Sequence, residues 1–159
     1  MTQDTPPIVA IDPGLSGAIA FLRADGALQR VIDMPTVKVG QKNRIGSRGL
    51  AMLLDEVQPM HAYVELVGAM PGQGVTSMFN FGHGAGVIEG VLAALEIPVT
   101  FVTPQSWKKW AQVTRDKGSS RIRAMQLFPA HAEAFQRVKD DGRAEAALIG
   151  LYGIRKGIE

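Results

Sequence analysis

Cysteine is absent from the 159-residue sequence. This absence excludes disulfide frameworks, zinc-thiolate sites, iron–sulfur clusters and cysteine nucleophiles. The sequence also has no run of about 18 uninterrupted apolar residues, which excludes a membrane-spanning helix and a membrane as partner. Residues 1–7 are polar and lack the apolar core of a signal peptide. We therefore expect a cytoplasmic protein.

Charged residues make up 20% of the chain, less than the roughly 25% of an average domain, and hydrophobic residues make up 46%. This composition is typical of a folded globular protein, and the length predicts one domain over residues 1–159. The net charge is +2 overall, but −3 over residues 1–103 and +5 over residues 104–143. A solvated helical surface would account for the basic segment, and so would a face that binds nucleic acid.

Short apolar runs separated by turn residues predict the N-terminal strands. They are expected over residues 8–11, 18–22 and 28–34. The turn Asp12–Gly17 joins the first two, because its proline, glycines and serine tolerate unusual backbone angles. The three strands form an antiparallel meander. Residues 37–46 are basic, contain glycine and show no periodicity, so they are expected to form a loop.

Apolar residues at helical spacing predict most of the remaining elements. Leu50, Leu53, Leu54 and Val57 mark a helix from about residue 47 that ends before Pro59. Further helices are expected over about residues 77–95, 104–110, 119–128 and 141–154, and further strands over residues 62–64 and 99–102. Trp107 and Trp110 are expected to pack the short helix. Together these elements predict an α/β fold: a five-stranded mixed sheet, with a three-strand antiparallel meander plus two parallel strands, flanked by helices on both faces.

Acidic residues stand where two predicted strands end. Asp12 follows the first strand and Glu65 follows the fourth, and α/β sheets build their sites at the carboxyl ends of neighbouring strands. Asp141 and Glu145 lie four residues apart and therefore share one face of the last helix. The alanine-rich start of that helix is expected to pack on the sheet. Acids in such a place are unfavourable unless they are paired or bound to a cation.

Carboxylates that converge from separate elements suit hard divalent cations such as Mg²⁺. Two such ions, roughly 3.5–4 Å apart, hydrolyse phosphodiesters: one activates water and the other stabilises the leaving oxygen. Each acid also has an ordinary interpretation, as a strand-end turn residue for Asp12 and Glu65 and as a helix-start acid for Asp141. The pattern as a whole favours a two-metal site.

Three segments resemble the motifs of RuvC-type Holliday junction resolvases. Residues 8–17 (IVAIDPGLSG) are similar to the first motif, residues 64–65 (VE) to the second and residues 144–148 (AEAAL) to the third. Residues 69–79 (AMPGQGVTSMF) resemble the phage and prophage branch more than the bacterial housekeeping one. The segments follow the family's order and spacing over about residues 8–153.

The resemblance implies an RNase H-like fold and a homodimer that resolves four-way DNA junctions by paired, symmetric nicking in bacterial or phage-infected cytoplasm. It also implies two Mg²⁺ ions per subunit, with Mn²⁺ able to substitute. Asp12, Glu65 and Glu145 match the family's metal ligands. The familiar bacterial pattern places two aspartates three residues apart, whereas Asp141 precedes Glu145 by four. Asp140 therefore remains a rival to Asp141 as the fourth ligand.

Four basic residues are candidate DNA contacts. The resemblance places Lys108 after the fifth strand and Lys117 before the next helix, where the family has lysines. Both would neutralise phosphates near the cut or stabilise its charged transition state, with Lys117 a candidate catalytic residue. An ordinary surface position is the alternative for both. Arg121 and Arg123 are more general candidates for contacts to the DNA arms.

Bacterial relatives place an aromatic residue, which stacks on junction bases, three positions after the second-motif glutamate. That position is Gly68 in this sequence. Met70, Gln73 or Phe79 would have to act as the wedge instead. The alternative for Phe79 is a place in the core.

Gly82, Gly86 and Gly90 recur every four residues along the long helix. Each glycine inside a helix costs about 1 kcal/mol relative to alanine, so a stripe of three needs compensation. Close approach of the backbone to the sheet or to a partner helix would provide it. The resemblance favours the partner, because the family's dimer interface lies on this helix.

Two other functions are consistent with the same residues. One is another RNase H-like metal nuclease that acts on RNA or RNA–DNA hybrids, which cutting of a hybrid duplex would reveal. The other is a catalytically silent junction-binding dimer, which Mg²⁺- or Mn²⁺-dependent cleavage would exclude.

Overall fold

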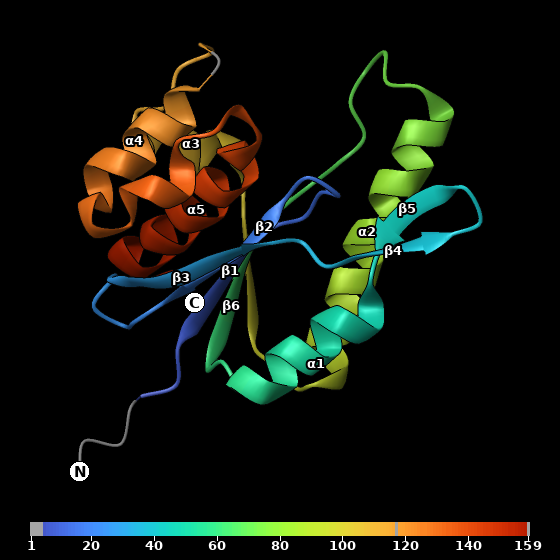
Figure 1. The fold of residues 1–159 in the computed structure, drawn as a ribbon, viewed down its shortest axis with the longest axis horizontal. Helices are drawn as coiled ribbons and strands as arrows, with labels where there is room; N and C mark the ends of the chain where they lie inside the picture. Colours follow the sequence, from blue (N-terminus) through green and yellow to red (C-terminus); the bar gives the residue numbers. More distant parts are fainter. Residues whose placement is uncertain (1–4, 117, 159) are drawn as a thin grey trace.

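A five-stranded mixed sheet forms the centre of the computed structural model, which describes residues 5–116 and 118–158 (Figure 1). Its strands are β1 (Ile8–Asp12), β2 (Ala18–Leu22), β3 (Leu28–Asp33), β6 (His61–Glu65) and β7 (Val99–Val102). Their order is β3-β2-β1-β6-β7; β1, β2 and β3 pair antiparallel, and β1, β6 and β7 pair parallel. The predicted sheet is confirmed.

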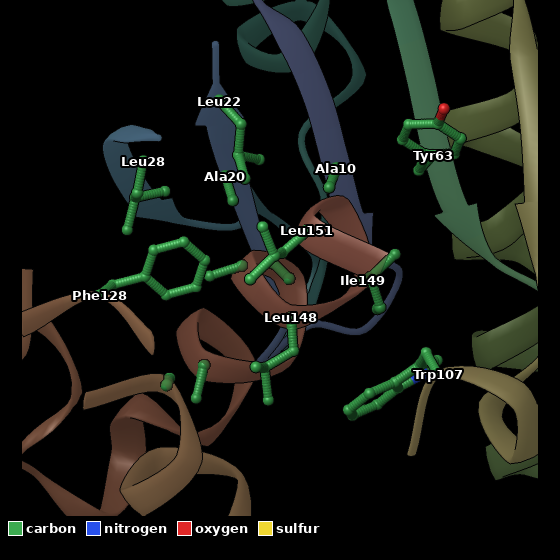
Figure 2. Packing of buried hydrophobic residues seen from close by; sticks show 14 of the residues in the cluster. Ala10, Ala20, Leu22, Leu28, Tyr63, Trp107, Phe128, Leu148, Ile149 and Leu151 are labelled. Atoms are coloured by element: carbon green, nitrogen blue, oxygen red, sulfur yellow. The ribbon is translucent and has the colours of Figure 1, made fainter. Parts of the chain in front are cut away.

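Helices cover both faces of this sheet. They are α1 (Ser47–Val57) and α2 (Val75–Ala94) on one face, and α3 (Pro104–Ala111), α4 (Ser119–Leu127) and α5 (Asp141–Lys156) on the other. Two stretches of 3-10 helix, η1 (Pro129–Phe135) and η2 (Val138–Asp140), join α4 to α5. Because side chains alternate along a strand, Val9 and Ile11 of β1 enter the α1–α2 core, whereas Ile8 and Ala10 enter the α3–α5 core. Figure 2 shows the second of these cores.

The prediction of a loop over residues 37–46 is wrong. Two short strands, β4 (Thr36–Val39) and β5 (Lys42–Ile45), form an antiparallel hairpin instead, with Gly40 at φ 62° in its turn. Nearly all of its side chains are exposed, so the segment lacks the apolar alternation by which a half-buried strand is detected. The hairpin is defined by the antiparallel pairing of its two strands, which the sequence pattern does not show.

Helix α5 lies against the sheet because small residues form its contact face. A Cβ atom on Gly150 would come within 2.8 Å of Ala10 Cβ, and one on Gly153 within 2.6 Å of the Tyr63 ring. At the start of the helix, a Cβ atom on Gly142 would overlap the Ser16 carbonyl oxygen. The close approach brings the first turns of α5 to the turn that follows Asp12.

Gly142→Ala should therefore destabilise the protein by about 1–3 kcal/mol, because backbone atoms of the turn must move to admit the methyl group. The measurement is the free energy of unfolding by urea. Gly68→Ala is the control, since a Cβ atom there meets nothing within 4 Å, and its effect should stay within about 0.5 kcal/mol. Equal unfolding midpoints for the two variants would contradict this account of α5 packing.

Candidate active site

Three carboxylates lie at one end of the sheet, near enough for their charges to act on one another. Asp12 and Glu65 are the last residues of β1 and β6, which are parallel neighbours, so their side chains leave the same edge. Glu145 comes from α5, which packs over that edge. The charges of Glu145 and Glu65 both act on Asp12. We call Asp12, Glu65 and Glu145 the acidic cluster.

All three carboxyl groups have raised pKa values, and burial is the largest cause for each. The effect is strongest at Asp12, where burial and then the negative charges of Glu145 and Glu65 hold the pKa well above its usual range. Among the described residues, none donates a hydrogen bond to the Asp12 side chain. The cluster therefore holds negative charge that is only partly compensated.

Lys108 of α3 provides part of the compensation. Its ammonium charge lowers the pKa of each member of the acidic cluster, against the stronger effect of burial. Its Nζ lies 5.3 Å from the centroid of the Trp107 ring. The structure thus brings Lys108 close to the acidic cluster.

Two residues of the site were not expected to contact the acids. Trp107 is fully buried, which confirms its packing role, but its indole N–H also donates a 2.6 Å hydrogen bond to Glu65 Oε2. The Ser120 hydroxyl donates to Glu145 Oε1 at 3.4 Å. A buried indole N–H usually finds a hydrogen-bond acceptor. Because Trp107 and Glu65 are 42 residues apart, local sequence patterns could not identify Glu65 as that acceptor.

Asp140 and Asp141 have different surroundings. Asp140 is 1% exposed and accepts hydrogen bonds from Arg137, which lower its pKa despite the opposing effect of burial. Asp141 is half exposed, accepts a 2.7 Å bond from Arg121 Nε, and its charge acts on Glu145. The structure therefore places Asp141, rather than Asp140, beside the acidic cluster.

A polar cleft flanks Glu145. One cavity of about 330 Å³ is lined by Asp12, Asp141, Glu145 and Lys139, among others. Another, of about 500 Å³, shares Asp141 and Glu145 and extends to Lys108. Polar linings that are rich in carboxylates suit a hydrated cation better than an apolar ligand.

No three His, Cys, Asp or Glu side chains in the described ranges lie close enough together to form a ready-made metal site. The donor set nevertheless suits a hard divalent cation, because it consists of carboxylates that burial and mutual repulsion disfavour as bare charges. A cation would relieve this repulsion more completely than Lys108 does alone.

The remaining candidate DNA contacts differ in their exposure and in the contacts they make. Met70 and Phe79 are 68% and 63% exposed, so the alternative of a core position for Phe79 is wrong. Gln73 lines a cavity of about 250 Å³ together with Glu65. Arg123 donates to the Ala111 carbonyl at 2.8 Å and so ties α4 to α3. Lys117 lies outside the described residues.

The three glycines of the α2 stripe face open space. A Cβ atom at Gly82, Gly86 or Gly90 meets nothing within 4 Å, so the stripe does not pack on the sheet of its own chain. Gly84, on the opposite side of the helix, packs against Ile45.

In the described part of the chain, no helix has both the length and the apolar character needed to cross a membrane.

Comparison with solved structures places this architecture among known folds. Thermus thermophilus RuvC superposes with a TM-score of 0.64 at 15% identity, covering 95% of this chain and 96% of that one. The same protein bound to a Holliday junction substrate gives 0.64 at 15% identity, covering 96% and 97%. The fowlpox virus Holliday junction resolvase gives 0.62 at 17% identity, covering 96% and 99%.

The yeast mitochondrial Holliday junction resolvase Ydc2 also matches, with a TM-score of 0.63 at 14% identity over 93% of this chain and 77% of that one. No protein-family model and no curated protein sequence matches the chain. The resemblance to the phage branch stays a prediction. The superpositions and the sheet order together show that the chain has the fold of the RuvC-type Holliday junction resolvases.

Proposed function

We propose that the protein is a divalent-metal-dependent endonuclease that resolves four-way DNA junctions by paired nicking as a homodimer. The observation that carries this proposal is the acidic cluster: Asp12 is partly buried, accepts no side-chain hydrogen bond from the described residues and lies beside two further carboxylates at one end of the sheet of a RuvC-like fold. The matching structures include one in complex with a Holliday junction substrate, which supports branched DNA as the partner of this chain as well.

The acidic cluster and Asp141 would hold the ions, two per subunit, with Mg²⁺ or Mn²⁺ as the metal. When bound, they would supply the Lewis acidity that activates water and stabilises the leaving oxygen. The residues of the chain position these ligands. Trp107 holds one oxygen of Glu65, and Arg121 holds Asp141. Lys108 faces the bound phosphate and offsets its charge.

The α2 helix supports a dimer. His83 and Glu89 are its ionisable residues, and apart from Thr76, Ser77 and Asn80 near its start the other residues are apolar or glycine. Only one side of the helix contacts the core, through Gly84, Ile88 and Leu92. Val75, Phe79 and the stripe Gly82–Gly86–Gly90 lie toward the other side and are exposed. A second copy of the helix would cover this face and compensate the glycines.

The decisive experiment is cleavage of a mobile four-way junction with the products mapped on all strands. We expect symmetric nicks in Mg²⁺ and none in EDTA. A matched RNA–DNA hybrid duplex at the same salt should stay intact. Cutting of the hybrid instead of the junction would assign the protein to another class of RNase H-like nuclease, and junction binding without cutting in Mg²⁺ or Mn²⁺ would make it a silent binding dimer.

Trp107→Phe should weaken metal binding about tenfold while the fold is retained. The variant keeps a buried ring but loses the N–H that orients Glu65, and loss of such outer partners typically lowers metal affinity 10–100-fold. Calorimetric titration with Mn²⁺ measures the effect without requiring activity. Trp110→Phe is the control, because Trp110 packs on Tyr152 and, among the described residues, the indole that bonds the acidic cluster is that of Trp107. Unchanged Mn²⁺ affinity in Trp107→Phe would remove Trp107 from the site.

A further inference from the structure

The β4–β5 hairpin projects from the molecule beside α2 and, within residues 5–116 and 118–158, forms a two-stranded sheet separate from the main one (Figure 1). Every residue of β4 is exposed, and β5 buries Ile45, which packs against Gly84 of α2. The hairpin is therefore anchored at its base, and its tip and outer face are open.

The hairpin region carries charge of one sign. Residues 34–54 contain four basic residues and no Asp or Glu. Three of them, Lys38, Lys42 and Arg44, lie in the hairpin, and Arg48 lies in the first turn of α1. Within the described ranges, none of the four takes part in an ion pair. Their positive charge is thus available to an external polyanion.

The strand register sorts these side chains onto faces. Val37 lies opposite Arg44 and Val39 opposite Lys42, so the four side chains share one face of the ribbon. Ile45 pairs with Thr36 and therefore lies on the other face, which packs toward α2. The outer face combines two valines, each about half exposed (49% and 52%), with two cations. The major groove of B-DNA is wide enough to admit such a two-stranded ribbon.

One continuous surface links the hairpin to the acidic cluster. A cavity of about 350 Å³ is lined by Pro13 of the turn after Asp12, by Arg44 of the hairpin and by Gln73. Pro13 and Gln73 also line the cavity that contains Glu65. A polyanion held over the acidic cluster would therefore extend toward the hairpin.

We propose that the β4–β5 hairpin binds duplex DNA and holds one arm of the junction beside the acidic cluster; the identity of the nucleic acid rests on the proposed function. Cations without acidic neighbours bind phosphates. Residues 34–54 contain no aromatic side chain on which an unpaired base could stack. The partner is therefore the backbone and groove of a duplex arm rather than a single strand.

The test compares Lys42→Gln/Arg44→Gln with the matched control Arg155→Gln/Lys156→Gln, which removes the same charge from the far end of α5. Affinity for a four-way junction is measured by fluorescence anisotropy in Ca²⁺ between 50 and 200 mM salt, roughly the range over which phosphate contacts dominate. The hairpin variant should bind about tenfold more weakly at low salt. Its salt slope should fall by about 2, because two phosphate contacts are lost. The control should bind like the unmodified protein.

A second comparison uses junctions with shortened arms. The unmodified protein should lose affinity as the arms shorten, and the hairpin variant should lose less, because its arm contact is already missing. Equal affinities and slopes for the hairpin variant and the control would overturn the inference. An equal loss of poly-glutamate binding would assign the hairpin to acidic peptides instead. Failure of the unmodified protein to prefer a junction over a linear duplex would contradict the proposed function, not the hairpin contact.

Discussion

Asp12→Asn is expected to abolish junction cleavage while the protein still folds and binds the junction. Asparagine keeps the size of the side chain but removes a negative oxygen from the acidic cluster. Loss of an outer-shell partner alone costs 10–100-fold, so loss of a ligand should lower the cleavage rate by more than about 100-fold. Single-turnover cleavage in Mg²⁺ and anisotropy in Ca²⁺ separate the two effects.

The same variant should be more stable than the unmodified protein at pH 7 without metal. Burial and the nearby carboxylates raise the folded-state pKa of Asp12 above its unfolded-state value. Ionising Asp12 therefore opposes folding. This loss of stability is absent below the unfolded-state pKa, and it grows as the pH rises from the unfolded-state pKa to the folded-state pKa. Metal-free unmodified protein should gain stability as the pH falls from 7 into this interval, and Asp12→Asn should show a weaker dependence. Melting temperatures across pH measure both.

Asp55→Asn is the matched control, because it makes the same chemical change on the exposed surface of α1. It should leave cleavage and the pH dependence of stability unchanged. Added Mn²⁺ should raise the melting temperature of the unmodified protein and of this control, since a ligand stabilises the state that binds it. The increase should be smaller for Asp12→Asn. Full turnover by Asp12→Asn would remove Asp12 from the site.

Gly86→Leu should convert a dimer into a folded monomer. Within the described part of one chain, a Cβ atom at position 86 meets nothing within 4 Å, and leucine favours a helix over glycine by up to about 1 kcal/mol. Between two copies of α2, the added volume overpacks the contact in both subunits, at about 1–3 kcal/mol for each. Sedimentation velocity and circular dichroism measure assembly and folding separately.

The functional consequence appears on a supercoiled plasmid that extrudes a cruciform. Paired nicking by a dimer linearises the plasmid, whereas independent nicking leaves nicked circles. We expect Gly86→Leu to give mainly nicked circles. Gly84→Leu is the contrasting variant: a Cβ atom there lies 3.0 Å from Ile45 Cδ1, so it should destabilise the monomer itself. A dimeric, fully active Gly86→Leu protein would place the subunit contact elsewhere.

Local sequence patterns were sufficient to predict the order and type of most elements and the strand-end positions of Asp12 and Glu65. These features depend on local patterns, namely apolar runs, helical spacing and turn residues, which lie within a few positions of one another. The last helix and its Asp141–Glu145 spacing were predictable for the same reason. The β4–β5 hairpin escaped prediction because its exposed strands carry no buried face to create a pattern.

Contacts between residues far apart in the sequence emerged only from the folding of the whole chain. Contact of Trp107 with Glu65 spans 42 positions and that of Arg121 with Asp141 spans 20, so neither is encoded in a local pattern. Each of Asp140 and Asp141 is bound by an arginine, but only the charge of Asp141 acts on Glu145 among the described residues, which follows from how α4 and η2 meet α5. Glycines are alike in sequence, yet those of α5 contact the sheet and the α2 stripe faces solvent. Only the packing of the whole chain distinguishes them, because a glycine's role is set by the atoms that approach it.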